Sequence, residues 1–216
     1  MTDTRARPYR LQRRLEAMAE TRDRIARAAF ELHATVGPSQ ATISAVAERA
    51  GVERHTVYRH YPDMVSLIRA CTLHGIEVTG LPQPDRWASI PDPLVRFRTA
   101  LEEMYAYYRA NEALIANILR DLPVMPELAA GSADYQDHLG RIWGTVLGPW
   151  MRLRGARGDR VRALTSTALE FGTWQALTSR GGLDDRAAAA TMVASVEAAL
   201  TAGRRYRAAL HPRPCV

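Results

Sequence analysis

The sequence predicts an all-α fold in which a small N-terminal helix-turn-helix domain precedes a larger helical domain. Apolar residues recur at helical spacing along most of the 216 residues, and no strand-like alternation extends beyond a few positions. Between residues 80 and 93, one glycine and four prolines interrupt the helical pattern and divide the chain. About half of the residues are apolar, which is enough to bury a core in each part.

The N-terminal residues 1–20 are expected to form a flexible basic arm and the start of the first helix. Arginines without apolar periodicity occupy the first ten positions, and helical spacing begins at Leu11. Thr21 is a candidate cap for a new helix, and Gly37-Pro38 ends the pattern. The DNA-binding domain is expected over residues 21–79.

The stretch from Thr42 to Tyr61 has the pattern of two short helices joined by a tight turn. The Thr42 hydroxyl is a candidate cap for the first helix. Gly51 stands where that helix should stop, because glycine accepts the left-handed conformation that follows many helices. A second helix is expected from about Glu53, with polar side chains facing outward, as in a helix that enters a DNA major groove.

The chain beyond the Pro-rich stretch is predicted to form a second, larger domain over residues 80–216. Its apolar spacing predicts helices rather than strands throughout. The expected helices cover roughly residues 92–109, 111–122, 139–154, 161–180 and 184–206.

The net charge is +6, and every basic side chain is an arginine. Eleven arginines and seven acidic residues lie within residues 1–60, so much of the positive excess clusters near the helix-turn-helix, as binding to DNA requires. Arginine favours bidentate contacts with phosphate and guanine. Genomic codon bias is the simpler explanation for the absence of lysine.

The sequence gives no sign of an enzyme, a metal site or a cofactor site. Its six histidines are scattered, and neither HExxH nor CxxC occurs. Two cysteines, no apolar stretch of membrane-spanning length and no signal-peptide core favour a cytoplasmic protein without a membrane partner.

The turn Ala50-Gly51-Val52 and the following Thr56-Val57-Tyr58-Arg59-His60-Tyr61 resemble the tetracycline-repressor (TetR/AcrR) family of bacterial transcription regulators. The resemblance covers about residues 22–70. It implies a sequence-specific DNA-binding regulator, commonly a repressor, that binds a palindromic operator as a homodimer through its last two long helices. It also implies a second domain that binds a small effector, here one that is at least partly apolar or aromatic.

The resemblance implies DNA-contacting roles for the outward residues of the two short helices. Tyr58 is expected to place its hydroxyl on a phosphate, with core packing as the alternative, whereas Tyr61 is expected in the core. The predicted DNA-binding residues are Thr42, Ser44, Arg49, Arg54, His55, Thr56, Tyr58, Arg59 and His60.

Three positions depart from the family pattern. Many members have small residues where Glu53 and His55 stand, and a lysine where Met64 stands. Glu53 opposes a phosphate, and Met64 removes an expected phosphate contact. These departures keep an alternative open, namely a helical interaction or small-molecule-binding protein with weakened DNA binding.

Aromatic and apolar residues of the second domain are candidates to line an effector pocket, with a few polar residues to orient the ligand. Simple core packing is the alternative for each of them. The predicted ligand-binding residues are Trp87, Met104, Tyr105, Tyr108, Asn117, Ile118, Asp121, Trp143, Leu147, Phe171, Trp174 and Gln175.

Overall fold

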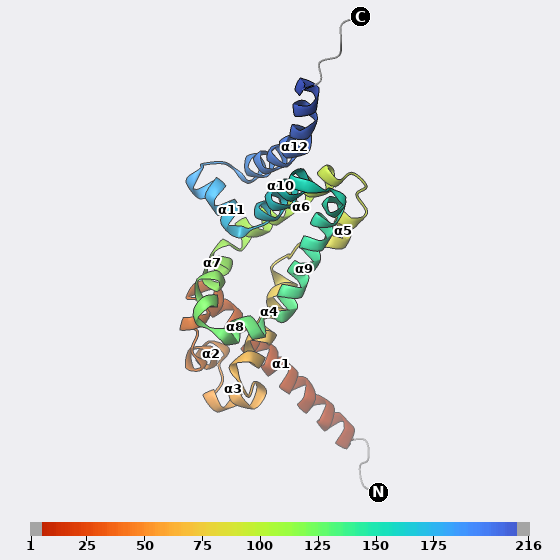
Figure 1. Ribbon diagram of the computed structural model, residues 1–216. Helices are drawn as coiled ribbons and strands as arrows, with labels where there is room; N and C mark the ends of the chain where they lie inside the picture. The colour runs from red at the N-terminus through yellow and green to blue at the C-terminus, as the bar shows by residue number, and fades with distance from the viewer. Residues whose placement is uncertain (1–5, 211–216) are drawn as a thin grey trace, which may run out of the picture. The chain divides into compact units, whose positions relative to one another are not determined.

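The computed structural model describes the backbone of residues 6–210 and the side chains of residues 9–202, and all regular structure within them is helical (Figure 1). The predicted all-α class is confirmed. None of the described helices is long and apolar enough to cross a membrane. The helices are α1 Ala6–Thr35, α2 Ile43–Ala50, α3 Arg54–His60, α4 Met64–Val78, α5 Pro84–Ala88, α6 Pro93–Ala110, α7 Glu112–Asp121, α8 Pro126–Gly131, α9 Ala133–Leu147, α10 Gly155–Ala168, α11 Phe171–Gln175 and α12 Asp185–Leu210. Shorter helical turns lie at Pro38–Gln40, Leu122–Val124, Gly148–Arg152 and Ala176–Arg180.

The helices form two compact units, and the first combines two separate parts of the chain. Unit 1 contains the residues up to Thr79 together with Glu112–Gln136. Unit 2 contains Gly80–Asn111 and the residues from Asp137 onward. Helices α7 and α8 therefore belong to the same unit as the helix-turn-helix, although they come from the segment expected to form the second domain.

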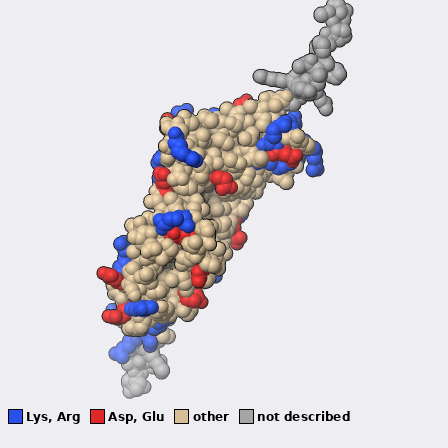
Figure 2. Space-filling view, turned by 60° about the vertical axis from the view of Figure 1, so that its left-hand side comes forward, with Lys and Arg blue, Asp and Glu red and all other residues tan. Residues whose placement is uncertain are grey.

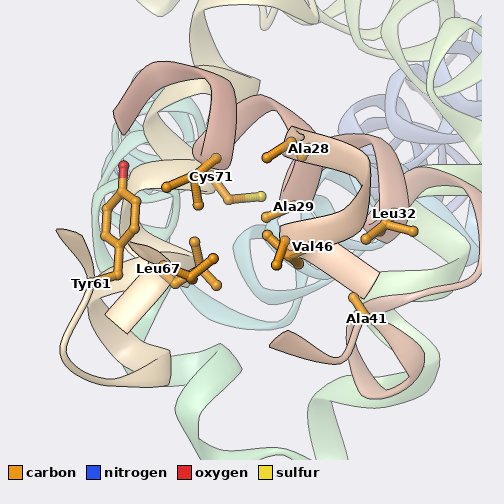
Figure 3. Packing of buried hydrophobic residues seen from close by; sticks show 12 residues of the cluster. Ala28, Ala29, Leu32, Ala41, Val46, Tyr61, Leu67 and Cys71 are labelled. Atoms are coloured by element: carbon orange, nitrogen blue, oxygen red, sulfur yellow. The ribbon is translucent and has the colours of Figure 1, made fainter. Parts of the chain in front are cut away.

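Unit 1 has a core in which α1 meets α2 and α4 (Figure 3). Ile25, Ala29 and Leu32 lie three or four residues apart, so they share one face of α1, and all three are buried. Val46 from α2 and Leu67 from α4 are buried against them. Full burial of one such branched side chain stabilises a fold by about 1.5–3 kcal/mol.

Helix α1 starts earlier and runs farther without interruption than the sequence pattern predicts. It begins at Ala6, so residues 6–10, expected in a mobile arm, are helical, while residues 1–5 lie outside the described part. The helix continues through Thr21, whose hydroxyl donates to the carbonyl of Ala17 at 2.8 Å instead of capping a new helix. Side chains from Tyr9 to Glu20 are exposed, so this half of α1 packs on nothing within the described residues.

Unit 2 is organised around α12, which packs along both α10 and α6. The stretch 80–93, expected as a linker, contains the short helix α5, whose Trp87 is fully buried. The Arg96 guanidinium holds this region together, because it donates to the carbonyls of Ile90 at 2.7 Å and Ala88 at 3.2 Å. The proline-rich stretch 80–93 is therefore an ordered connection that contains a short helix.

Candidate nucleic-acid interface

The turn between α2 and α3 is built from local hydrogen bonds. The Thr42 hydroxyl accepts a hydrogen bond from the Ala45 amide at 3.2 Å and caps α2, as predicted. Gly51 has φ 64° and ψ 40°, and its amide donates to the last carbonyls of α2, which confirms its predicted left-handed role. The chain then turns sharply enough for α3 to begin at Arg54.

Helix α3 is anchored by one apolar residue and presents polar residues elsewhere. Val57 is fully buried in the core of unit 1. A helix of this kind offers a DNA groove two guanidinium groups, each able to bind through two nitrogens, and several single hydrogen-bond donors. The side chains that are at least partly exposed on α3 are Arg54, His55, Thr56, Tyr58, Arg59 and His60.

Arg54 and Tyr58 contact each other across one turn of α3. The Arg54 guanidinium carbon lies 5.7 Å from the centre of the Tyr58 ring, and Nη2 donates to the phenol oxygen at 3.3 Å. Tyr58 is 44% exposed, so its ring is available to a partner, unlike the core packing considered as an alternative. Tyr61 lies in the core as predicted, with its hydroxyl donating to the carbonyl of Arg22 at 3.0 Å.

The remaining predicted contacts lie on or beside α2. Thr42 and Ser44 are exposed. Arg49 is exposed too, but its Nη1 lies 3.0 Å from a carboxylate oxygen of Glu31 on α1. This ion pair engages one end of the Arg49 guanidinium and offsets part of its charge.

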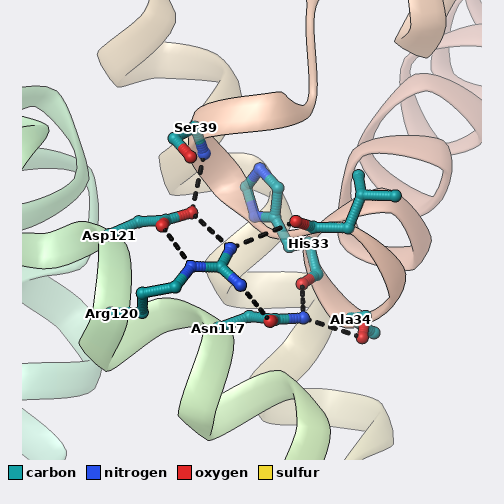
Figure 4. A network of polar contacts seen from close by, with 7 residues as sticks. His33, Ala34, Ser39, Asn117, Arg120 and Asp121 are labelled. Carbon is teal, nitrogen blue, oxygen red and sulfur yellow. Dashed lines mark hydrogen bonds and ion pairs between the residues drawn. The ribbon is translucent and has the colours of Figure 1, made fainter.

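Two polar side chains of α7, Asn117 and Arg120, bind backbone carbonyls at and just after the end of α1, as Figure 4 shows. The Asn117 amide donates to the carbonyls of His33 and Ala34 at 3.1 Å each. The Arg120 guanidinium donates to the carbonyl of Val36 at 3.1 Å. The last carbonyls of a helix have no partner within that helix, so α7 supplies the cap that α1 lacks.

Asp121 extends this cap to the residues that lead into α2. Its buried carboxylate accepts from the Ser39 amide at 2.9 Å and from Arg120 Nε at 2.8 Å. These hydrogen bonds, chiefly the one from Arg120, lower the pKa of Asp121 to about 2 against the opposing effect of burial. Gly37 passes so close, at φ 97°, that a Cβ there would overlap the Arg120 guanidinium. The cap therefore fixes the path from α1 into the helix-turn-helix.

Residues 25–71 match the family model described as bacterial regulatory proteins, tetR family. The chain is a TetR-family transcriptional regulator. The matched segment runs from the core face of α1 into α4 and contains the complete helix-turn-helix. The regulator therefore binds DNA through this motif and belongs to a family without enzymatic activity, as the sequence predicts.

Solved structures share the fold over most of the chain. A transcriptional regulator from Rhodococcus sp. RHA1 is 18% identical, with a TM-score of 0.61, and covers 84% of this chain and 96% of its own. NalD, the secondary repressor of the MexAB-OprM multidrug efflux pump in Pseudomonas aeruginosa, is 18% identical, with a TM-score of 0.59 and coverages of 85% and 97%. FadR from Bacillus subtilis in complex with stearoyl-CoA is 17% identical, with a TM-score of 0.55 and coverages of 82% and 97%. No curated protein compared with the chain matches it significantly.

The residues predicted to line an effector pocket divide between the two units. Asn117, Ile118 and Asp121 belong to unit 1, and the side chains of Asn117 and Asp121 are engaged there with the end of α1 and with Ser39. These two polar side chains therefore have protein partners within unit 1. The predicted residues that belong to unit 2 are Trp87, Met104, Tyr105, Tyr108, Trp143, Leu147, Phe171, Trp174 and Gln175.

Four of the predicted aromatic residues in unit 2 form one cluster around Tyr108. Its ring centre lies 5.4 Å from that of Phe171, 5.9 Å from that of Trp174 and 6.3 Å from that of Tyr105. The Trp174 indole donates to Asp185 at 2.9 Å. Met104 is fully buried, and the predicted residues that are only partly buried in unit 2 are Trp143, Leu147 and Gln175.

The two tyrosine hydroxyls in this cluster have protein partners. Tyr105 donates to the carbonyl of Ala168 at 2.8 Å, and Tyr108 donates to that of Leu169 at 2.6 Å. Both carbonyls lie at the C-terminal end of α10, where backbone acceptors need partners from outside the helix. Burial raises the pKa of both phenols, so they remain protonated donors.

Other buried polar atoms of unit 2 have no hydrogen-bond partner within the described residues. They are the indole nitrogens of Trp87 and Trp150 and the hydroxyl of Thr165. A buried donor without an acceptor costs about 1–3 kcal/mol, so a bound molecule that carries an acceptor would offset this cost. Of these residues, Trp87 is among the predicted ligand-binding residues. Trp150 and Thr165 follow a helical core pattern, which gives no signal of an unpaired polar atom.

Proposed function

We propose that this TetR-family protein is a cytoplasmic homodimeric repressor of a palindromic operator and that a small effector controls its affinity for DNA. The observation that carries the proposal is the exposed polar surface of α3. This helix is held in place by α1 and α2, each of which is capped at one end. The proposed DNA contacts are Thr42, Ser44, Arg49, Arg54, His55, Thr56, Tyr58, Arg59 and His60.

The residue types divide these contacts between base and backbone. Arg54, at the exposed start of α3, is proposed to bind a guanine through its two terminal nitrogens. The phenol of Tyr58, together with Thr42 at the cap of α2, is proposed to bind phosphates, which fixes the register of α3 in the groove. Glu53 precedes α3 and its side chain makes no capping hydrogen bond. Its negative charge would therefore repel a neighbouring phosphate.

Replacement of Arg54 tests the DNA-binding surface. Duplexes selected by the wild-type protein from a random library supply the operator. Fluorescence anisotropy should then show that Arg54→Ala loses about 1–3 kcal/mol of binding free energy and discriminates less at one base pair. Arg86→Ala, which removes an exposed arginine from α5 in unit 2, is the matched control and should leave binding unchanged. Failure to select any operator would favour the alternative of a helical protein with weakened DNA binding.

Two features support the homodimer. One short recognition helix offers little contact area, and two helices one DNA turn apart read a palindrome. Helices α10 and α12 pack on each other, and each exposes small side chains that permit close approach of a second copy. The exposed small residues are Ala156, Ala163 and Thr167 on α10 and Ala190, Ala194, Ala198 and Thr201 on α12.

The effector is proposed to be an apolar molecule that carries hydrogen-bond acceptors. The aromatic cluster of unit 2 supplies apolar surface, and the unpaired donors of Trp87, Trp150 and Thr165 supply hydrogen bonds. FadR, which shares the fold, is described in complex with stearoyl-CoA, so long-chain acyl-CoA is the first probe to use. Binding should raise the melting temperature of the wild-type protein and change its affinity for the selected operator.

A further inference from the structure

The N-terminal half of α1 is an exposed basic helix that extends beyond the core of unit 1. Figure 1 shows it projecting past α3 without another helix beside it. The side chains from Tyr9 to Glu20 are exposed, whereas Ile25 begins the buried part of the same helix. In Figure 2 arginine side chains lie at the lower end of the molecule, beside the grey N-terminal residues.

The core-facing side of α1 continues along this exposed half. Leu11, Leu15 and Met18 occupy the row that contains Ile25 and Ala29 farther along, because they recur at three- and four-residue spacing. All three are nevertheless exposed, at 59%, 57% and 45%. An apolar row that extends beyond its own core and stays exposed indicates a surface that binds a partner.

Positively and negatively charged side chains occupy different sides of the exposed half of α1. Arg10 and Arg14, four residues apart, border the apolar row, and neither has an acidic partner within the described residues. Glu16 and Glu20 form a row on another side of the helix. Arg13 lies toward that acidic row, with its guanidinium carbon 5.9 Å from the centre of the Tyr9 ring.

The end of α3 fixes where this surface lies relative to the recognition helix. Tyr61, the residue after α3, donates to the Arg22 carbonyl and lies under the Arg22 guanidinium at 5.4 Å. Arg14 and Arg10 are eight and twelve residues before that contact, so they lie roughly 12 Å and 18 Å farther along the axis of α1. Laid along a duplex at about 3.4 Å per base pair, these distances would span roughly four or five base pairs.

We infer that the exposed half of α1 is a second DNA-binding element, which contacts the duplex that flanks the sequence read by α3. The inference rests on the proposed operator binding. Two observations favour DNA as the partner: the surface continues directly from the helix-turn-helix unit, and its border arginines complement a phosphate backbone. Leu11 and Leu15 then pack against deoxyribose and thymine methyl groups, the apolar parts that a groove exposes.

The test compares two duplexes with the full-length chain. One duplex contains only the selected operator, and the other extends that operator by eight base pairs of fixed sequence at each end. At moderate salt the wild-type protein should bind the extended duplex about tenfold more tightly. The plot of log K against log salt should also be steeper on the extended duplex, by about 0.9 for each added phosphate contact.

Two charge-matched double variants locate the effect on the helix. Arg10→Gln/Arg14→Gln should abolish the gain from the extension and leave binding to the short operator within twofold of wild type. Arg13→Gln/Arg27→Gln removes the same charge from the other side of α1 and should keep the gain.

Three results would overturn the inference. The wild-type protein would gain nothing from the extension, the two double variants would lose affinity equally, or Arg10→Gln/Arg14→Gln would change the oligomeric state instead of flank binding. The last result would point to a second copy of the chain as the partner. Binding to the short operator tests the proposed function separately, so a failure of one idea is distinguishable from a failure of the other.

Discussion

His33 is a buried, uncharged histidine at the end of α1. Its Nδ1 lies 3.3 Å from the Cys71 sulfur on α4, and its backbone carbonyl accepts from Asn117. Burial lowers the pKa of His33 to about 4, although the nearby Asp121 carboxylate acts in the opposite direction, and burial raises the pKa of Cys71 to about 12. A protonated thiol and a neutral imidazole therefore share a weak hydrogen bond, and the tautomer of His33 sets which of the two donates.

The stability of the protein should fall between pH 6.5 and pH 4 because of His33. In that range the unfolded chain binds a proton that the folded protein rejects, so His33 lowers the unfolding free energy by up to about 1.4 kcal/mol per pH unit as the pH decreases. His60 also has a lowered pKa, through desolvation and the nearby Arg59, and adds to the slope.

Urea unfolding of wild type and His33→Gln at pH 7, 6, 5 and 4.5 isolates the contribution of His33. The variant should lose less stability than wild type over this range, whatever its stability at pH 7. Asp121, with its pKa lowered to about 2, contributes in full above pH 4 and loses its contribution only below that value. Equal slopes for the two proteins would contradict the buried neutral state of His33.

Local chemistry could be predicted from the sequence more reliably than long-range partners. Thr42 and Gly51 act through bonds within four residues, so their cap and turn roles follow from residue type alone. Asn117 instead bonds to carbonyls 83 and 84 residues away, and its helical position resembles that of any solvated asparagine. The three-dimensional path of α7 is therefore needed before its role can be recognised.

The short helices depend on their ends more than on their length. Helices α2 and α3 have eight and seven residues, which is too short for stability in isolation. The turn between them is therefore the main local feature that holds the two helices in the helix-turn-helix arrangement.

Replacement of Gly51 by alanine should test this turn without adding a steric clash. A Cβ at Gly51 meets no heavy atom within 4 Å, so the cost comes from the left-handed conformation, at about 1–2 kcal/mol of unfolding free energy. Gly140→Ala on α9 is the matched control, because that position is also open and lies within a helix, and it should stabilise the protein by about 0.5–1 kcal/mol. Opposite signs in chemical denaturation are expected, and a neutral Gly51→Ala would refute the argument.

Element boundaries were predictable where glycine, proline or polar caps stand, and less so elsewhere. Asp92 and Pro93 start α6 as the pattern indicates, with Asp92 accepting from the amides of Leu94 and Val95. The first turns of α1 were missed because they carry no apolar spacing. Helix α5 was missed because prolines are equally common in linkers and at the first position of a helix.

For the assembled protein, the proposed dimer depends on the outer faces of α10 and α12. Small residues lie on the inner faces of these helices as well, where Ala168, Ala188 and Ala199 are buried inside unit 2. The exposed row that includes Ala190, Ala194 and Ala198 is a better guide, and only burial in the structure distinguishes the two faces of α12.

Light scattering coupled to size exclusion should show a dimer for wild type and a monomer for Ala194→Arg. A large charged side chain at this exposed site blocks close approach of a second copy and leaves the core of unit 2 intact. Ala130→Arg, exposed on α8 in unit 1, should remain dimeric. A monomeric wild type, or a dimeric Ala194→Arg, would rule out this interface.

The capping of α1 by α7 also bears on how regulators of this kind can be recombined. A single crossover after residue 79 would transplant the helix-turn-helix but leave behind Asn117, Arg120 and Asp121, so the graft would carry unpaired carbonyls at the end of α1. A working chimera has to move residues up to 79 and residues 112–136 together and keep Gly37 with them. Recombination during evolution would therefore transfer unit 1 intact only together with part of the segment that follows α6.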